Sequence, residues 1–314
     1  MTVAVLPGSM KPALAPCLPA WVDARFFDNG DELVALAPEA EIGWFDYFQE
    51  GIAPIAEAVR RAERMRWLVT IGAGVDFLPL DILIARGVMI TKGSGLNAVA
   101  VAEYTVMAML AQAKNYREVV RAQDRREWLA DSPGKRQLAG SRALLVGYGA
   151  IGRELAQRLR AFAVEVVPVS RSGRDGSLRP DEWQARLGEF DWVILAAPST
   201  DETRHAIGAA ELAAMKADAV LVNVARGTLV DQQALAQALT DMRIGGALLD
   251  VTEPEPLPAD DPLWAFDNVQ ITMHLSGRAQ DTVYAGAVER FLANLEVYRA
   301  GRQPQPLYDP AAGY

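Results

Sequence analysis

Cysteine is almost absent from the chain, since Cys17 is the one cysteine among 314 residues. No disulfide can therefore form within the chain, and a cytoplasmic setting is the expected one because disulfides mark oxidising compartments. An isolated cysteine usually behaves as a small hydrophobic residue, so we expect Cys17 to be buried.

Long apolar runs and basic surface are lacking as well. The longest apolar stretch with helical spacing, residues 98–113, is interrupted by Glu103 and Gln112 and predicts no membrane span. Residues 1–6 are too short, and lack the basic flank, for a signal peptide. A net charge of −9 argues against nucleic acid or an anionic membrane as partner. With 51% hydrophobic residues, the chain is globular and long enough for two domains.

Histidine is scarce, which makes His274 informative. It is one of two histidines and follows residues 269–273, an apolar run that predicts a buried strand. Arg226 and Glu255 precede it, each at or just past the end of an apolar run. A proton donor, a carboxylate that holds it and a guanidinium that binds an acid are what the reduction of a 2-oxo acid requires. The other histidine, His205, has no such neighbours, and we expect a structural role for it.

A glycine-rich turn indicates the cofactor. The apolar run 143–146 leads into Gly147, Tyr148, Gly149, Ala150, Ile151 and Gly152, and apolar residues with helical spacing follow. A strand, a tight turn and a helix in this order form the fingerprint of a dinucleotide site, with the pyrophosphate at the helix N-terminus. We therefore expect all six turn residues to contact a dinucleotide, and we expect no metal site.

Apolar runs alternate with helical stretches, which predicts an α/β protein with parallel sheets. We expect two doubly wound lobes: a Rossmann cofactor domain of residues 98–281 inserted into a flavodoxin-like substrate domain of residues 1–97 and 282–314. The terminal helix has apolar positions suited to packing back on the first lobe. One helix from residue 98 to about 122 should lead into the cofactor domain. The expected strands are 3–6, 42–45, 67–71 and 89–91, then 143–146, 165–169, 192–196, 220–224, 246–250 and 270–273.

Several spaced motifs make the chain resemble the D-isomer-specific 2-hydroxyacid dehydrogenases. Besides the glycine-rich turn, they are residues 222–231 (VNVARGTLVD), 249–258 (LDVTEPEPLP) and 271–274 (ITMH), with 72–76 (GAGVD) and 97–103 (NAVAVAE) upstream. The resemblance covers most of the chain. Met273 stands where the family usually has proline, and Thr252 where it usually has an aromatic residue. Neither change removes a chemical group, so both affect only the shape of the pocket.

The resemblance implies roles for the polar residues. His274 would protonate the substrate oxygen, Glu255 would hold its tautomer, and Arg226 would bind the substrate carboxylate. Glu253 is the rival of Glu255. Asp250 is placed among the cofactor-binding residues and is expected to tune the network of Glu255 and His274, with a buried structural carboxylate as the equal alternative.

Further residues are expected around the ligands. Backbone N–H groups of Gly72, Ala73 and Gly74 would complete the carboxylate site, and Ala225 would contact the cofactor. Trp44 belongs to an aromatic cluster that is a candidate wall of the substrate pocket, with core packing or a partner contact as the alternative; the other members are Phe45, Tyr47 and Phe48.

The end of the second strand of the cofactor domain predicts a preference for NADP. NAD enzymes with this turn place an acidic residue about 20 residues on, to bind the ribose hydroxyls. Counting from Gly147 leads to Ser170, and Arg171, Ser172 and Arg174 follow. No carboxylate repels a 2′-phosphate here, and two arginines can neutralise it. A solvated basic loop without preference, with NAD as a possible cofactor, is the alternative.

Together these features predict an NADP-preferring reductase of small 2-oxo acids such as glyoxylate or hydroxypyruvate. The resemblance implies a homodimer. One alternative is a 3-phosphoglycerate-type dehydrogenase, which would need further basic residues for the phosphate. The other is a catalytically idle protein that binds NAD(P) on the same fold.

Overall fold

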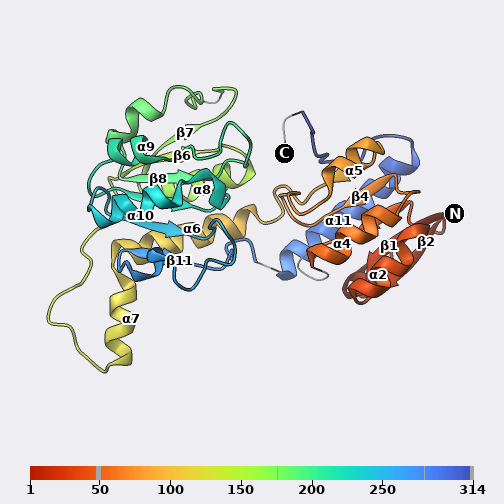
Figure 1. Ribbon diagram of the computed structural model, residues 1–314, viewed down its shortest axis with the longest axis horizontal. Helices are drawn as coiled ribbons and strands as arrows, with labels where there is room; N and C mark the ends of the chain where they lie inside the picture. The colour runs from red at the N-terminus through yellow and green to blue at the C-terminus, as the bar shows by residue number, and fades with distance from the viewer. Residues whose placement is uncertain (47–50, 175, 279, 312–314) are drawn as a thin grey trace. The chain divides into compact units, whose positions relative to one another are not determined.

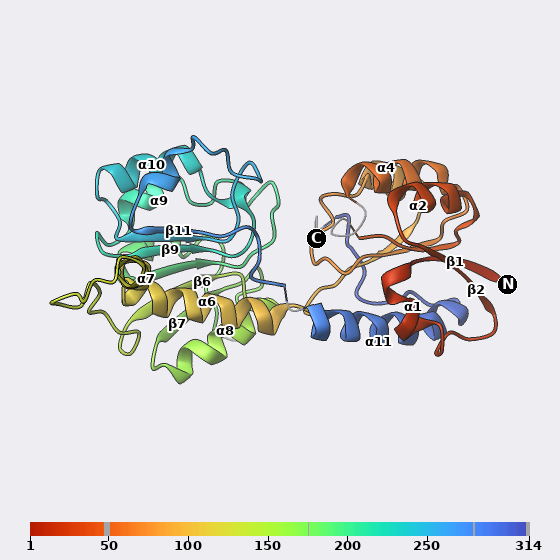
Figure 2. The same cartoon turned by 90° about the horizontal axis from the view of Figure 1, so that it is seen from below.

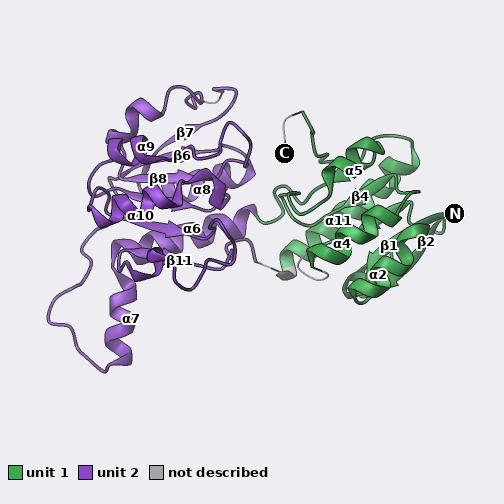
Figure 3. Ribbon diagram, viewed as in Figure 1, with its two compact units in different colours: residues 1–97, 279–314 green, residues 98–278 purple. Residues whose placement is uncertain are grey.

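The computed structural model describes residues 1–46, 51–174, 176–278 and 280–311 (Figure 1). The chain forms two compact units, coloured separately in Figure 3. Unit 1 consists of Met1–Asn97 and Ala279–Tyr314, and unit 2 of Ala98–Arg278. Each unit is an α/β layer structure around a parallel sheet, so the expected fold class is confirmed.

Unit 1 contains a five-stranded sheet in the order β2-β1-β3-β4-β5. All its ladders within the described residues are parallel. The strands are β1 (Thr2–Pro7), β2 (Val22–Phe27), β3 (Ile42–Trp44), β4 (Trp67–Val69) and β5 (Met89–Thr91). Strand β2 was not among the strands expected from the sequence, because only the first and last of its six residues are buried at this edge of the sheet.

Helices cover both faces of the unit 1 sheet (Figure 2). One face packs against α2 (Gly30–Leu36), α4 (Ile52–Arg61) and α5 (Leu80–Ala85), and the other against α1 (Lys11–Leu14) and α11 (Gln280–Arg299). The apolar face of α11 buries Phe291, whose ring lies 5.2 Å from that of Trp44 and 5.4 Å from that of Trp67. This packing makes unit 1 discontinuous in sequence.

Unit 2 contains a six-stranded parallel sheet in the order β11-β10-β9-β8-β6-β7. All six expected strands are present, because strands buried on both faces read as continuous apolar runs. Residues Ala98–Ala113 (α6) and Ala150–Ala161 (α8) pack on one face, and Ala209–Ala214 (α9) and Gln232–Thr240 (α10) on the other (Figure 2). The strands are β6 (Arg142–Val146), β7 (Glu165–Val169), β8 (Trp192–Leu195), β9 (Val220–Asn223), β10 (Gly246–Leu249) and β11 (Val269–Ile271).

Two expectations from the sequence are wrong. The helix expected from residue 98 to about 122 is broken into α6 and α7 (Tyr116–Asp124), because Asn115 adopts a left-handed conformation with φ of +45°. Cys17 is exposed rather than buried, since it lies in the turn after the short helix α1. Within the described residues, no helix combines the length and the apolar character needed to cross a membrane.

Candidate active site

The glycine-rich turn joins β6 to α8, and each glycine meets a different constraint. Gly147 has φ of +107°, and a Cβ there would lie 2.5 Å from the backbone of Ala196. A Cβ on Gly152 would lie 2.1 Å from the carbonyl oxygen of Gly147, so this position closes the helix onto the turn. In contrast, a Cβ on Gly149 would meet nothing within 4 Å. The turn is therefore tightly packed at Gly147 and Gly152 and open at Gly149, where a pyrophosphate could approach the protein backbone.

The same turn places the first N–H groups of α8 beside that open space. Gly149 is the N-cap of this 12-residue helix and contributes no side-chain cap. Uncapped N–H groups at a helix N-terminus attract phosphate oxygens. Tyr148 lies under the guanidinium of Arg153, with 4.9 Å between Cζ and the ring centroid. The residues present thus fit a dinucleotide pyrophosphate.

The loop after β7 carries the residues that are expected to determine the preference for NADP over NAD. Ser170 is held by Ser177, with 2.6 Å between the two hydroxyl oxygens, whereas Arg171 and Arg174 are exposed. The hydrogen bond from Thr200 is the main cause that lowers the pKa of Glu202, and the charge of Arg171 adds to it. Arg171 therefore lies within electrostatic range of the loop that follows β8.

His274 follows β11 and bonds to Glu255, which follows β10. Nδ1 of His274 lies 3.0 Å from Oε2 of Glu255. Because an ionised carboxylate only accepts hydrogen bonds, Nδ1 carries the hydrogen, and Nε2 is the nitrogen left to exchange a proton with a ligand. The rival carboxylate, Glu253, instead pairs with Arg204 at 3.2 Å. The structure thus selects Glu255 as the partner of His274.

Glu255 is held on both oxygens. Its Oε1 accepts the N–H of Thr252 at 3.2 Å, and Thr252 is fixed by a hydrogen bond from its own hydroxyl to the carbonyl of Pro254. Burial raises the pKa of Glu255, but the hydrogen bond and charge of His274, the Thr252 N–H and the charge of Arg226 outweigh it, so the pKa lies below its ordinary value. An ionised carboxylate next to an imidazole favours the protonated ring.

Arg226 comes directly after the loop that ends β9. Its carbonyl accepts from the side chain of Asn223 at 2.8 Å, and its guanidinium donates to the carbonyl of Ala225 at 2.7 Å. The next residue, Gly227, has no space for a side chain, because a Cβ would lie 2.1 Å from the carbonyl of Thr252. The approach of these two loops brings Arg226 near enough to Glu255 for its charge to act on the carboxylate. Arg226, Glu255 and His274 therefore belong to one electrostatic cluster of unit 2.

Asp250 is 2% exposed, and both carboxylate oxygens bond within the chain. Oδ1 accepts from the hydroxyl of Thr272 at 2.7 Å and from the N–H of Leu275 at 2.9 Å, and Oδ2 accepts from the N–H of Ser276 at 3.1 Å. This arrangement fits a buried structural carboxylate and also ties Asp250 to the turn that carries His274, whereas the contact of Asp250 with the cofactor stays a prediction.

The three residues of unit 1 that were expected to bind a carboxylate differ in whether their backbone groups are already hydrogen-bonded. Gly72 is fixed by hydrogen bonds to Thr70 and Gly93, whereas the N–H groups of Ala73 and Gly74 have no acceptor among the residues that the structure describes. Two adjacent donors of this kind suit an anionic ligand.

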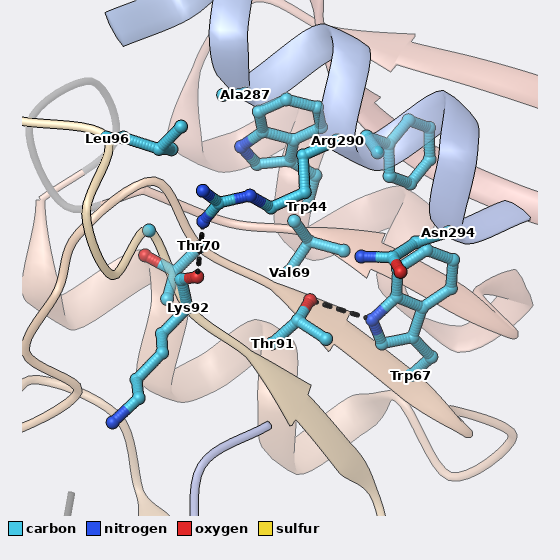
Figure 4. Close-up of a pocket in the computed structure, with 12 residues that line it drawn as sticks. Trp44, Trp67, Val69, Thr70, Thr91, Lys92, Leu96, Ala287, Arg290 and Asn294 are labelled. Atoms are coloured by element: carbon cyan, nitrogen blue, oxygen red, sulfur yellow. Dashed lines mark hydrogen bonds between the residues drawn. The ribbon is translucent and has the colours of Figure 1, made fainter. Parts of the chain in front are cut away.

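Trp44 does not line an open pocket, because its side chain is completely buried against α11 (Figure 4). The cavity beside it has a volume of about 10 Å³, space for roughly one water molecule. Phe45 is also fully buried, so core packing is the interpretation that fits both residues. Tyr47 and Phe48 lie outside the described residues.

Thr272 and Tyr104 are contacts that the sequence analysis missed. The Tyr104 hydroxyl lies 2.7 Å from Oγ1 of Thr272, which in turn bonds to Asp250. The position of Thr272, two residues before His274, was an available signal. Nothing local pointed to Tyr104, which lies 168 residues away from Thr272 in the sequence.

Comparison with known proteins identifies the family of the chain. Residues 106–276 match the profile of the family described as D-isomer specific 2-hydroxyacid dehydrogenase, NAD binding domain. The chain is 32% identical to glyoxylate/hydroxypyruvate reductase B of Yersinia pestis over 268 residues, which are 82% of this chain and 80% of that protein.

A second relative and a solved structure extend the comparison. D-3-phosphoglycerate dehydrogenase of Methanocaldococcus jannaschii is 30% identical over 78% of this chain, but the chain spans only 49% of that protein. The crystal structure of a D-isomer specific 2-hydroxyacid dehydrogenase family protein from Aeromonas salmonicida superposes with a TM-score of 0.86 at 26% identity, covering 98% of both chains.

Proposed function

This chain belongs to the family of D-isomer specific 2-hydroxyacid dehydrogenases, and on that basis we propose that it reduces small 2-oxo acids of the glyoxylate and hydroxypyruvate type to D-2-hydroxy acids. The observation that carries the proposal is the 3.0 Å bond between His274 and Glu255, next to Arg226. A protonated imidazole, a carboxylate and a guanidinium in one cluster are the groups needed to add a proton to the oxygen of an anionic substrate.

His274 supplies the proton in this proposal. A reduced nicotinamide cofactor, held through its pyrophosphate at the glycine-rich turn, would supply the hydride for the carbonyl carbon. As the carbonyl oxygen gains negative charge, Nε2 of His274 donates its proton to it, and the imidazolium becomes neutral. Glu255 stabilises the imidazolium before the transfer and keeps the hydrogen on Nδ1 afterwards, so Nε2 faces the substrate in either protonation state.

Arg226 binds the substrate carboxylate. Its guanidinium can offer two parallel N–H donors to the two carboxylate oxygens, and its charge also polarises the neighbouring carbonyl group.

NADPH is the proposed cofactor, with NADH as the weaker one. The support is the loop after β7, where Ser170 replaces an acidic residue and the exposed Arg171 and Arg174 carry positive charge. The alternative of an unselective basic loop makes a different prediction, equal use of NADH and NADPH.

We also propose that the protein is a homodimer formed through the outer face of α6 and α8. This face exposes the apolar side chains of Met107 and Phe162 at a hollow, and Val99 on α6 is exposed as well. Trp128, in the segment after α7, is 97% exposed. Apolar surface of this kind usually marks a contact with another protein surface, and a second copy of the chain is the proposed occupant.

A turnover assay tests the proposed reaction. The purified protein is offered glyoxylate, hydroxypyruvate, pyruvate and phosphohydroxypyruvate, each with NADPH and with NADH. The proposal expects glyoxylate and hydroxypyruvate to be reduced more efficiently than pyruvate and phosphohydroxypyruvate. Preference for phosphohydroxypyruvate would favour the 3-phosphoglycerate-type alternative, and cofactor binding without turnover of any acid would favour the idle binding protein.

A further inference from the structure

We propose that Tyr104 is a positioning residue for His274, acting through a chain of hydrogen bonds that passes from Tyr104 to Thr272 and on to Asp250. The inference rests on the proposed function in one respect, the assignment of His274 as the acid.

The hydrogen bonds join three separate elements of unit 2. The Tyr104 hydroxyl on α6 lies 2.7 Å from Oγ1 of Thr272, which follows β11, and this oxygen lies 2.7 Å from Oδ1 of Asp250, which follows β10. A carboxylate only accepts, and a threonine hydroxyl has one hydrogen to donate. Thr272 therefore donates to Asp250 and accepts from Tyr104. The direction of both hydrogen bonds is therefore fixed, from Tyr104 to Thr272 and from Thr272 to Asp250.

Asp250 holds the turn that carries His274 from both sides. Its carbonyl oxygen accepts the N–H of His274 at 2.8 Å. Its carboxylate accepts the N–H groups of Leu275 at 2.9 Å and of Ser276 at 3.1 Å. The turn depends on these bonds, because His274 has φ of +52°, a left-handed conformation that is unfavourable for residues other than glycine. A looser Asp250 would free the His274 backbone to leave this conformation.

Tyr104 is suited to hold Asp250 through Thr272. Burial raises the pKa of Tyr104; the bond to Thr272 acts against this, and the charge of Asp250 adds to it, so the hydroxyl keeps its hydrogen at the pH where imidazoles titrate. Each hydroxyl in a chain of donors polarises the next one, which strengthens the bond to the carboxylate. The helix α6, which carries Tyr104, is itself held in place by its packing on α8 and on the sheet.

At Tyr104 the hydrogen bond can be removed without changing the packing of the ring. The ring of Tyr104 packs against the core cluster between α6, α8 and the sheet. Phenylalanine would keep these contacts and remove only the hydroxyl. A Tyr104→Phe variant therefore isolates the hydrogen bond from the fold.

The first experiment compares steady-state kinetics of the full-length wild type with Tyr104→Phe, Thr272→Val and the double variant. Loss of one neutral hydrogen bond predicts a fall in kcat of roughly 3- to 10-fold for Tyr104→Phe, with the KM for the reduced cofactor unchanged. The kcat of the double variant should match that of Thr272→Val, because Thr272→Val alone already interrupts the series of hydrogen bonds between Tyr104 and Asp250. Thr272→Ser keeps the hydroxyl and should retain most of the kcat. The matched control is Thr105→Val, which removes a buried hydroxyl bonded to Val101 on the same helix.

The second experiment reads the position of His274 without turnover. With only two histidines in the chain, ring-labelled histidine gives two sets of NMR signals, and His205→Asn assigns them. The proposal expects one sharp His274 set in the wild type and in Thr105→Val, and a broadened or doubled set in Tyr104→Phe and Thr272→Val. Unchanged His274 signals in Tyr104→Phe, or additive losses of kcat in the double variant, would overturn the inference. A wild type without turnover would refute the proposed function instead, and the NMR comparison would still decide on Tyr104.

Discussion

Nδ1 of His274 lies 3.0 Å from Oε2 of Glu255, although 19 residues separate the two along the chain. The bond orients the imidazole so that Nε2 is the nitrogen available to a ligand. The side chain of His274 remains 30% exposed, which leaves it accessible to a substrate.

Replacing His274 by Gln removes the proton donor and keeps a polar side chain of similar reach. We expect the reduction rate to fall by about 100-fold or more, since general acid catalysis contributes on that order. The affinity for the reduced cofactor, measured by fluorescence titration, should stay nearly the same. His205→Gln changes the other histidine and should leave turnover intact. Substantial turnover in His274→Gln would remove His274 from the reaction.

The pH dependence of reduction should report the charge of Glu255. Burial raises the pKa of Glu255, but the hydrogen bond and charge of His274 help to hold it below its ordinary value, so the carboxylate is ionised beside the ring. An anion in that place favours the protonated form of an imidazole. Reduction needs the protonated ring, so the rate should be highest at low pH and fall as rising pH removes that proton. Glu255→Gln removes the negative charge, and the fall should therefore move to lower pH.

The measurement is kcat/KM for the oxo acid across pH, in the wild type and in two matched variants. Glu253→Gln changes the neighbouring carboxylate, which pairs with Arg204 instead, and should leave the profile in place. A shift in Glu253→Gln and none in Glu255→Gln would transfer the role to Glu253.

Arg226→Lys keeps the charge but loses the planar pair of donors. A lysine ammonium is a point charge without the rigid, parallel pair of N–H donors that matches a carboxylate, so we expect kcat/KM for 2-oxo acids to fall by at least 10-fold. Steady-state kinetics with the preferred acid provide the measurement. Arg243→Lys, at an exposed position before β10, is the control for the same substitution. Near-normal kinetics in Arg226→Lys would mean that the guanidinium does not bind the substrate.

Much of the fold was predictable because buried parallel strands leave a local signal. The six strands of unit 2 read as apolar runs, and the glycine-rich turn marked the first of them. The edge strand β2 lacked that signal, since four of its six residues are not buried. The break between α6 and α7 depends on the backbone of Asn115, which apolar periodicity does not report.

The sequence predicted which residues form the candidate site, but it did not predict all the hydrogen bonds among them and their neighbours. Arg226, Glu255 and His274 stand at strand ends, and the carboxyl ends of parallel strands meet at one edge of a sheet. The family resemblance favoured Glu255 over Glu253, but both follow β10, and only the fold of the loop shows that Glu255 bonds to His274 while Glu253 pairs with Arg204. The bond between Tyr104 and Thr272 connects elements 168 residues apart, so no local pattern contains it.

The cofactor preference should depend on the loop after β7. The wild type should have a higher kcat/KM with NADPH than with NADH, because Arg171 and Arg174 can neutralise a 2′-phosphate and Ser170 does not repel it. A Ser170→Asp, Arg171→Ala double variant introduces the carboxylate that binds ribose hydroxyls and removes one cation, so the ratio should move towards NADH by at least 10-fold. Arg243→Ala removes an equal charge before β10 and should leave the ratio unchanged. A wild type that prefers NADH, or a double variant with an unaltered ratio, would contradict the assignment, since both arise if the basic loop is merely solvated.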